Sequence, residues 1–180
     1  MAIENDWNVG QFMTVQPCTV AADLALADAL DRMEANNIRH LLVTRDAHLV
    51  GVISNRDISL AQSLPGINAK KLKVSDAMSE HVYMCDAATP LAEVAAEMED
   101  HRYGCVVVLQ DELVVGIFTT TDAMRAIRTI VSGTIVEPRT VPTHLVDVTA
   151  EREHIHHHVR IGAGMARAVR GQPSLRGISG

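Results

Sequence analysis

The strongest constraint on the fold is a constant offset of 65 residues between two similar stretches of the chain. Gly51-Val-Ile-Ser-Asn-Arg-Asp57 and Gly116-Ile-Phe-Thr-Thr-Thr-Asp122 each place apolar residues before a hydroxyl residue, two spacers and an aspartate. The same offset aligns further residues without a gap: Val9 with Val74, Met13 with Met78, Leu26 with Leu91, and Val43 with Val108. Self-similarity at a fixed period indicates a repeated structural unit. The chain is therefore interpreted as a tandem duplication.

The composition restricts the core and the class of partner. Hydrophobic residues make up 47% of the chain but aromatic residues only 3%, so the core must be aliphatic. The net charge is −6, although the last 30 residues hold five Arg against two Glu. The rest of the chain is therefore strongly acidic, which argues against nucleic-acid binding there.

No apolar run approaches the roughly 20 residues that span a bilayer, and the N-terminus lacks the features of a signal peptide. Three cysteines without a Cys-x-x-Cys spacing indicate reduced thiols, so we expect a cytoplasmic protein with no membrane partner.

Each copy is predicted to fold as β-α-β-β-α. In the first copy, a helix contains Leu26, Leu30 and Met33 on one face, strands 40–44 and 49–53 form a hairpin, and Ser54 caps a second helix. The second copy repeats this order with a helix at 90–100, strands at 105–109 and 113–118, and a helix from about 121 to 131. The predicted N-caps of the first helix in each copy are Asp23 and Thr89. A unit of about 50 residues is too small to bury its own sheet well, so the copies are expected to share a core.

The predicted boundaries follow from this order of elements. The first repeat covers residues 9–62, a linker with a Pro-Gly turn covers 63–73, and the second repeat covers 74–131. Residues 132–180 form a C-terminal extension that is expected to be irregular or flexible, because prolines and then a Gly- and Arg-dotted sequence replace the earlier periodicity.

The repeated stretch carries the candidate chemistry. An apolar strand leads into a helix N-terminus, where free N–H groups and the helix dipole favour an anion. The hydroxyl of Ser54 or Thr119 can donate to a phosphate, and the carboxylate of Asp57 or Asp122 can accept two hydrogen bonds from a vicinal diol such as that of ribose. The same spacing is also a plain capping arrangement, which is the favoured interpretation of one copy alone. Its recurrence in both copies favours a ligand site.

With these residues in place, the sequence resembles a tandem pair of cystathionine-β-synthase (CBS) domains, a Bateman module of the small stand-alone bacterial kind. The resemblance covers about residues 9 to 131 and rests on Phe12-Met13-Thr14, Ala77-Met78-Ser79, Ile38-Arg39-His40-Leu41-Leu42-Val43 and the two Gly-x-x-Ser/Thr-x-x-Asp stretches. It implies an α/β fold of the α+β sandwich-like kind, with two β-α-β-β-α repeats related by a pseudo-twofold axis. It also implies a homodimer and a regulatory, non-catalytic module that signals to an unidentified protein partner through ligand-dependent rearrangement.

The resemblance further implies an adenosine-type ligand. Members of this family often bind AMP, ADP, ATP or S-adenosylmethionine in clefts between the two copies, and AMP or ATP is the leading candidate here, with no other cofactor expected. Carried over by position, one cleft joins Ser54, Arg56 and Asp57 to Ser79, Tyr83, Tyr103, Gly104 and Cys105. The other cleft joins Thr119, Thr121 and Asp122 to Thr14, Cys18, Ile38, Arg39 and His40. In each cleft the aspartate is expected to hold the ribose diol and the hydroxyl residue a phosphate.

The two clefts are not expected to be equivalent. Arg39 and His40 can reach a phosphate held by the motif of their own copy, to which Arg56 adds a second guanidinium, whereas the second copy has no cation at these positions. Hydrogen bonds from a guanidinium to a phosphate are charge-assisted and roughly twice as strong as bonds between neutral groups. The cleft of Asp57 is therefore the predicted site of a phosphorylated ligand, and the cleft of Asp122 is expected to be empty or to take a nucleoside-like ligand. Arg39 and His40 can instead be solvent-facing residues at a strand start.

Two other functions stay open. One is a ligand-free scaffold whose basic tail recruits a partner, and the other is a metal-responsive protein that uses the histidines of the tail. A solvated tail is favoured over a metal site, because a tail forms a poor preformed site, and over nucleic-acid contact, because no aromatic residues accompany its arginines. The chain contains no Gly-x-Ser-x-Gly, His-Glu-x-x-His or P-loop motif, so no enzymatic activity is expected. The tail residues concerned are His154, His156, His157, His158, Arg160, Arg167, Arg170 and Arg176.

Overall fold

The computed structural model describes residues 7–65, 68, 71–133 and 139–140 of the chain. The first repeat contains β1 (Thr14–Val15), β2 (Thr19–Ala21), α1 (Leu26–Ala35), β3 (His40–Arg45), β4 (His48–Ser54) and α2 (Asn55–Ser63). The second contains β5 (Met84–Asp86), α3 (Leu91–His101), β6 (Cys105–Gln110), β7 (Leu113–Thr119) and α4 (Thr120–Ser132), and β8 (Arg139–Thr140) follows it. Short 3₁₀ helices at Val9–Gln11 and Val74–Asp76 open the repeats. The repeated order of helices and strands confirms the predicted fold class.

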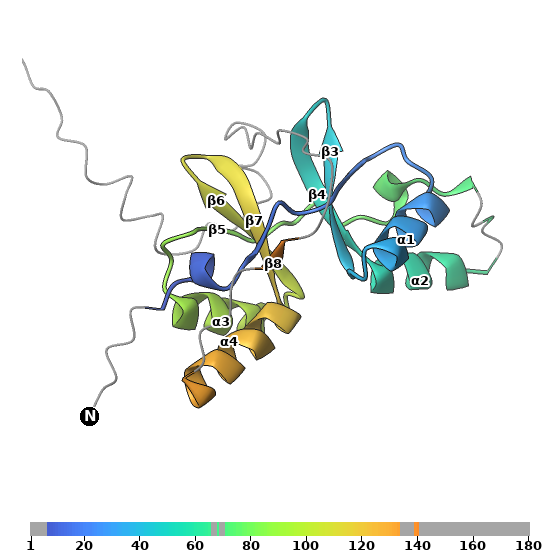
Figure 1. Cartoon of the computed structure of the whole chain (residues 1–180). Helices are drawn as coiled ribbons and strands as arrows, with labels where there is room; N and C mark the ends of the chain where they lie inside the picture. The colour runs from blue at the N-terminus through green and yellow to red at the C-terminus, as the bar shows by residue number, and fades with distance from the viewer. Residues whose placement is uncertain (1–6, 66–67, 69–70, 134–138, 141–180) are drawn as a thin grey trace, which may run out of the picture.

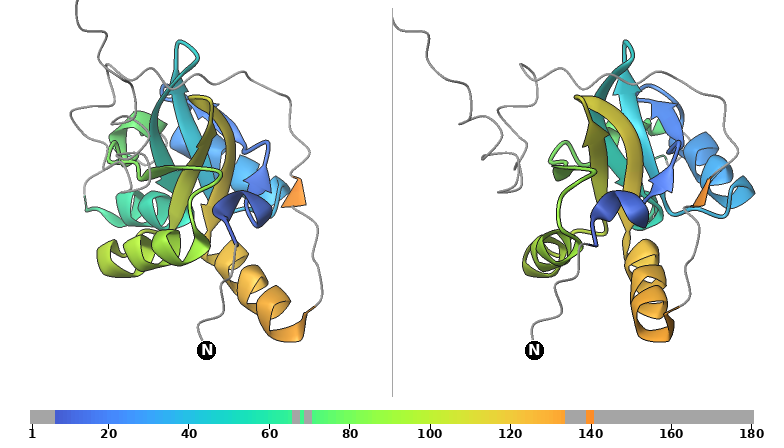
Figure 2. Two further views of the ribbon diagram at one scale, coloured as in Figure 1. Left: turned by 90° about the vertical axis from the view of Figure 1, so that its left-hand side faces the viewer. Right: turned by 60° about the vertical axis from the view of Figure 1, so that its left-hand side comes forward.

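The two sheets lie back to back, with helices on their outer faces. One sheet has the strand order β2-β3-β4 and the other β5-β6-β7-β1-β8. The hairpins β3–β4 and β6–β7 lie side by side at the centre of the molecule, α1 and α2 pack on the first sheet, and α3 and α4 pack on the second (Figures 1 and 2). In β3, Leu41 and Val43 contact the helices while Leu42 belongs to the cluster between the sheets. The strand is apolar at successive positions because both of its faces are buried.

The start of each repeat joins the sheet of the other repeat. Thr14 of β1 pairs with Ile117 of β7, and Ser79 forms a bridge to Val52 of β4. A shift of 65 residues converts the second pair into the first. Backbone hydrogen bonds show the same reciprocity, from Val9 N–H to the Thr89 carbonyl at 3.0 Å and from Val74 N–H to the Leu24 carbonyl at 2.9 Å. The repeats are thus related by a pseudo-twofold axis, and each contributes strand and core residues to the other.

The glycine of each repeated motif makes room for this exchange. A Cβ on Gly51 would lie 2.7 Å from the carbonyl oxygen of Ser79 and 3.0 Å from Sδ of Met78. A Cβ on Gly116 would collide with the Met13 side chain in the same way. Both neighbours belong to the start of the other repeat, so a side chain at either glycine would displace that segment from the strand.

The helices that follow the hairpins begin at reciprocal capping boxes. The side chain of Ser54 accepts a hydrogen bond from Asp57 N–H, and the carboxylate of Asp57 accepts one from Ser54 N–H. Thr119 and Asp122 form the same pair at the start of α4. Each aspartate is therefore held at the first turn of a helix whose end faces the other repeat.

The predicted N-caps Asp23 and Thr89 are wrong, because α1 and α3 begin without a side-chain cap. Their first N–H groups bond instead to backbone that precedes the start of the other repeat. The Leu26 N–H donates to the Leu72 carbonyl at 2.8 Å, and the Leu91 N–H donates to the Trp7 carbonyl at 2.9 Å. A backbone carbonyl next to the exchanged start segment thus accepts a hydrogen bond from a helix N–H group that a capping side chain would otherwise bind.

Residues 66, 67, 69 and 70 of the predicted linker and nearly all of the C-terminal extension lie outside the described residues. The histidines and arginines of the tail lie wholly outside them. Across the ranges that the structure describes, no helix has both the length and the apolar character needed to cross a membrane.

Candidate functional site

Two cavities lie at the junction of the repeats. The Asp57 cleft, at the start of α2, has a volume of about 750 Å³. The Asp122 cleft, at the start of α4, has a volume of about 400 Å³. Both volumes fall in the range of about 300–1,000 Å³ that small-molecule sites occupy.

The structure brings together both sets of residues predicted from the sequence. The Asp57 cleft is lined by all members of the first set, namely Ser54, Arg56, Asp57, Ser79, Tyr83, Tyr103, Gly104 and Cys105. The Asp122 cleft is lined by all members of the second set, namely Thr14, Cys18, Ile38, Arg39, His40, Thr119, Thr121 and Asp122. In each cleft, the motif of one repeat faces residues from the start and the first hairpin strand of the other.

The carboxylate of Asp57 keeps one oxygen open to the cleft. Its Oδ2 accepts hydrogen bonds from the backbone N–H of Ser54 at 2.8 Å and from the Ser54 hydroxyl at 2.6 Å. Its Oδ1 receives no hydrogen bond from any residue within the described ranges. Because Asp57 is only half-buried and lines the cavity, this oxygen can accept hydrogen bonds from two neighbouring hydroxyl groups of a ligand.

Stacked rings and a buried thiol form part of the wall of the Asp57 cleft. The rings of Tyr83 and Tyr103 are nearly parallel, with centroids 5.5 Å apart and an interplanar angle of 12°, and His101 stacks on Tyr103 at 5.3 Å. Burial, with a smaller effect of the Asp57 carboxylate, raises the pKa of the Cys105 thiol to about 12. The thiol stays protonated at neutral pH and is therefore a poor nucleophile. The wall offers apolar contact area rather than a reactive group.

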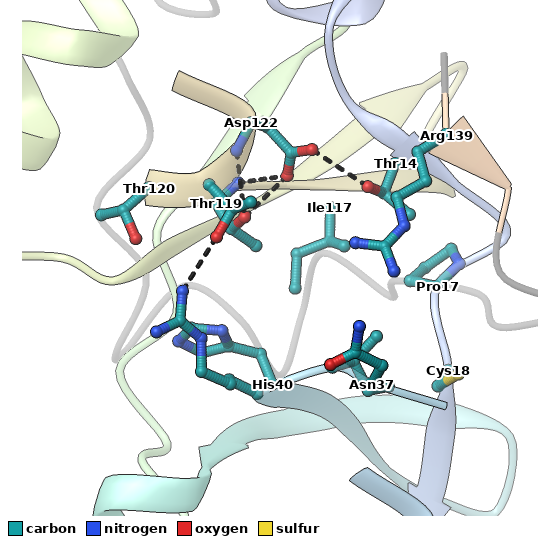
Figure 3. A pocket seen from close by; sticks show the side chains of 13 residues that line it. Thr14, Pro17, Cys18, Asn37, His40, Ile117, Thr119, Thr120, Asp122 and Arg139 are labelled. Carbon is teal, nitrogen blue, oxygen red and sulfur yellow. Dashed lines mark hydrogen bonds between the residues drawn. The ribbon is translucent and has the colours of Figure 1, made fainter. Parts of the chain in front are cut away.

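The carboxylate of Asp122 is fully engaged by the protein. Its Oδ2 accepts from the backbone N–H and the hydroxyl of Thr119, at 2.9 and 2.7 Å. Its Oδ1 accepts from the Thr14 hydroxyl at 3.1 Å and lies 3.4 Å from the guanidinium of Arg125. The Thr14 and Thr119 contacts are drawn in Figure 3. With Asp122 only 3% exposed, a ligand diol would have to displace these partners.

Two residue differences between the repeats explain why the aspartates differ. The position of Arg125 is occupied in the first repeat by Leu60, which cannot pair with a carboxylate and is exposed. The position of Thr14 is occupied by Ser79, whose hydroxyl donates to the His81 carbonyl at 3.2 Å rather than to Asp57. The carboxylate of Asp57 thus keeps an open oxygen, whereas that of Asp122 is occupied by Arg125 of its own repeat and by Thr14 of the other.

Arg39 and His40 lie between the clefts and line both of them. The guanidinium of Arg39 donates to the Thr121 hydroxyl at 2.9 Å, so it reaches the motif of the second repeat. Arg39 thus supplies to this motif the cation that the second repeat itself lacks at the equivalent positions. Burial and the adjacent Arg39 charge lower the pKa of His40, against the opposing effect of the carboxylates of Asp57 and Asp122. The imidazole is therefore mainly neutral at pH 7.

Sequence reasoning missed two further arginines. Arg102 lines the Asp57 cleft and ends α3 in a left-handed conformation with φ of 59°. Its equivalent at the 65-residue offset is Asn37, with φ of 50°, which lines the other cleft, so the repeat itself is a signal that could have found Arg102. Arg139 lines the Asp122 cleft from β8 (Figure 3). It follows the second repeat, has no counterpart in the first, and could not be found from the repeat.

Comparison with known protein families matches the CBS domain twice, at residues 9–63 and 74–129. The chain belongs to the CBS-domain family. CBS-domain pairs are regulatory modules, and the two matches confirm the resemblance seen in the sequence. A CBS domain-containing protein of Dictyostelium discoideum is 31% identical, over 64% of this chain and 88% of its own length.

Solved structures of CBS-domain proteins share the fold. A Vibrio cholerae protein assigned to acetoin utilization (AcuB) is 30% identical, with a TM-score of 0.62 over 74% of this chain and 100% of that chain. The CBS domain pair of protein MJ0100, solved in complex with 5′-methylthioadenosine and S-adenosyl-L-methionine, is 26% identical, with a TM-score of 0.61 over 68% of this chain and 97% of that chain. The chain thus shares its fold with the CBS domain pairs of solved structures.

The metal and scaffold alternatives depend on the tail. Among the described residues, no group of three or more His, Cys, Asp or Glu side chains could hold a metal ion. The histidines and arginines on which both alternatives rest lie outside those residues, so these two functions stay untested predictions.

Proposed function

We propose that this CBS pair is a regulatory sensor that binds an adenosine-type ligand in the Asp57 cleft, with AMP or ATP as the first candidates. The observation that carries the proposal is the open Oδ1 of Asp57, next to a cavity of about 750 Å³. Ribose presents two adjacent hydroxyl donors, which this single oxygen can accept. The MJ0100 pair, solved with two adenosine compounds, supports the class of ligand.

The phosphate groups of a nucleotide would be held by arginine side chains. The Ser54 hydroxyl already donates to Asp57 at 2.6 Å, so it is not the best phosphate donor. Arg56 and Arg102 line the same cleft and are exposed, and Arg39 lines it from the first repeat. Guanidinium groups match phosphate geometry and give charge-assisted hydrogen bonds. This arrangement favours AMP or ATP over S-adenosylmethionine, which carries no phosphate.

The proposed signal is a change in how the repeats are arranged, read by a protein partner that is still to be identified. The Asp57 cleft is built from both repeats, so a ligand there contacts each of them. Such a ligand shifts the arrangement only if it binds two states with different affinity. The proposed role is binding without catalysis. A homodimer is part of the proposal, supported by the exposed apolar residues Met124, Ile127 and Val131 on α4.

Calorimetric titration of the full chain with AMP, ADP, ATP and S-adenosylmethionine tests the proposal. We expect one of the phosphorylated compounds to bind, and a concentration of 100 times its dissociation constant should stabilise the fold by about 2.7 kcal/mol. Asp57→Asn should abolish binding, because an amide presents a donor as well as an acceptor to the diol. Asp122→Asn is the matched control and should still bind.

Three results would contradict the proposal. One is the absence of binding by every adenosine compound. A second is unchanged affinity in Asp57→Asn, and a third is loss of binding in a folded Asp122→Asn variant, which would move the diol site to the other cleft. Circular dichroism of each variant separates loss of binding from loss of folding.

A further inference from the structure

The wall of the Asp122 cleft contains one residue that the duplication does not account for. Every other residue that lines this cleft has a residue 65 positions away that lines the Asp57 cleft. Arg139 is the exception, because the residue 65 positions before it, Val74, is buried in the core of the first repeat and does not line the Asp57 cleft. Arg139 is therefore an addition to the cleft rather than a member of the duplicated site.

β8 carries Arg139 along the outer edge of the second sheet. Its two residues pair parallel with β1, Arg139 with Thr14 and Thr140 with Val15. In the strand order, β1 lies between β7 and β8, so β8 is the edge strand. Figure 3 shows the Arg139 side chain running from β8 past Thr14 into the pocket, with Pro17 beside it. The backbone pairing with β1 thus places this side chain in the cavity.

The sizes of the two clefts differ in the sense expected of such an addition. The Asp122 cleft has a volume of about 400 Å³, against about 750 Å³ for the Asp57 cleft. We propose that β8 is a removable strap: paired with β1, it holds the Arg139 side chain in the Asp122 cleft and restricts access to it, and detached from β1 it leaves the cleft open. This inference concerns access to the Asp122 cleft and does not rest on adenosine binding at Asp57.

Few contacts hold the strap in place. β8 has only two residues, and both are exposed. The Arg139 side chain makes no hydrogen bond or ion pair with any other residue that the structure describes. Segments with few buried apolar contacts and solvent-exposed backbone hydrogen bonds open locally at a low cost in free energy. The strap can therefore detach while β1, which is also paired with β7, stays in its sheet.

A removable strap would connect the C-terminal extension to the state of the cleft. Residues 141–180 follow β8 directly in the chain, so a partner that binds the extension and draws β8 away from β1 removes Arg139 from the cleft. Conversely, a ligand that needs the space of the Arg139 side chain displaces β8. The two events favour each other, because both require the detached state. No residue of β8 lines the Asp57 cleft, so this control acts on one cleft of the pair.

Alkylation of the full chain by N-ethylmaleimide tests the strap, because each cleft contains its own thiol probe. Cys18 lines the Asp122 cleft and is 3% exposed, and Figure 3 shows it on the Pro17 side of the pocket. Cys105 lines the Asp57 cleft, and Cys85 is buried in the core of the second repeat. Mass spectrometry of the digested protein gives a separate alkylation rate for each cysteine.

Arg139→Ala should speed the alkylation of Cys18 about tenfold, which corresponds to about 1.4 kcal/mol less for exposing the thiol. The rates of Cys105 and Cys85 should not change. Arg128→Ala is the matched control, since it removes an exposed arginine that lines neither cleft. Arg139→Met keeps most of the length of the side chain without its charge, so Cys18 should react more slowly in this variant than in Arg139→Ala.

The dependence on urea shows whether the strap opens by itself. The effect of urea on an opening reaction scales with the surface that the reaction exposes. Detachment of two residues exposes little surface, so the alkylation of Cys18 in the wild type should change little with urea below the unfolding transition. Alkylation of Cys85 requires opening of the core and should rise steeply.

Three results would overturn the proposal. The first is a Cys18 rate in Arg139→Ala no higher than that in Arg128→Ala. The second is an equal acceleration of all three cysteines in Arg139→Ala, which would give Arg139 a general role in stability. The third is a common urea dependence of Cys18 and Cys85 in the wild type. Adenosine binding, measured separately with Asp57→Asn, can succeed or fail independently of these results.

Discussion

Asp57 and Asp122 occupy equivalent positions in the two repeats, yet they differ in what remains for a ligand. Both use one oxygen for the capping box at the start of their helix. The second oxygen of Asp57 stays open, while that of Asp122 is taken by Thr14 and Arg125. The motif alone therefore does not determine whether its carboxylate is free to bind a ligand, because residues outside the motif can occupy the second oxygen.

This difference predicts unequal effects on stability. Asp122→Ala leaves the guanidinium of Arg125, whose side chain is 15% exposed, without its carboxylate, and breaking such a pair costs about 3 kcal/mol. Asp57→Ala removes only part of a helix cap, which costs about 1 kcal/mol. Urea unfolding of the two variants should show this order. Adding Arg125→Leu, which introduces the residue found at the equivalent position Leu60, should restore part of the stability lost in Asp122→Ala. Equal losses in the two single variants, or no recovery in the double variant, would contradict the pairing of Asp122 with Arg125.

His40 predicts how stability depends on pH. Its pKa is lowered in the folded state by burial and by Arg39, against the carboxylates of Asp57 and Asp122. The unfolded chain therefore takes up the proton first as the pH falls through 6.5, the ordinary pKa of the group, so stability present above that pH is lost below it. His40→Asn should lose less stability than the wild type between about pH 7.5 and pH 5.5. Parallel urea unfolding curves at the two pH values measure this, and an equal or larger loss in the variant would show that other groups set the dependence.

At the scale of the elements, the sequence carries enough information for the helices and strands of the repeat. Apolar periodicity gives α1, and the capping pairs Ser54–Asp57 and Thr119–Asp122 give the starts of α2 and α4. The 65-residue offset then transfers each element from one repeat to the other. The two sets of site residues have a different origin, since they were carried over by position from the resemblance to CBS-domain pairs.

Three features could not be predicted, and all depend on contacts between distant segments. The predicted N-caps of α1 and α3 failed because backbone preceding the other repeat binds their first N–H groups. Arg39 donates a hydrogen bond to Thr121 of the opposite motif; the resemblance placed both residues in one cleft, but the sequence does not give the bond between them. Arg139 enters the Asp122 cleft through a two-residue strand, and neither periodicity nor repetition marks so short an element.

At the scale of the whole molecule, the pseudo-twofold axis produces two clefts that share a wall but differ in chemistry. Both cavities are lined by Arg39, His40 and Thr120. A ligand that moves one of these side chains in one cleft therefore also changes the wall of the other cleft. The Asp57 cleft has an open carboxylate oxygen, whereas both carboxylate oxygens of Asp122 are occupied, so the two clefts suit different ligands. The CBS pair can on this view combine two chemical inputs, provided that each ligand distinguishes between arrangements of the repeats.

The outer face of α4 bears on the proposed homodimer. Met124, Ile127 and Val131 lie on one side of the helix and are 62%, 52% and 82% exposed, while Ala126 and Thr129 on the other side are buried. Exposed apolar residues gathered on one face mark interaction surfaces, and a second copy of the chain is the partner that the family resemblance implies. Sedimentation velocity of the full chain should therefore show a dimer.

Ile127→Glu should weaken that dimer about a hundredfold, because an unpaired charge buried in an apolar interface costs about 3 kcal/mol. Glu34→Lys, a charge change on the exposed part of α1, is the control and should leave the dimer intact. Both positions are exposed in the single chain, so neither variant should alter the circular dichroism spectrum. A wild-type chain that sediments as a monomer at every concentration, or an Ile127→Glu variant that stays dimeric, would show that this face of α4 is not the interface between copies.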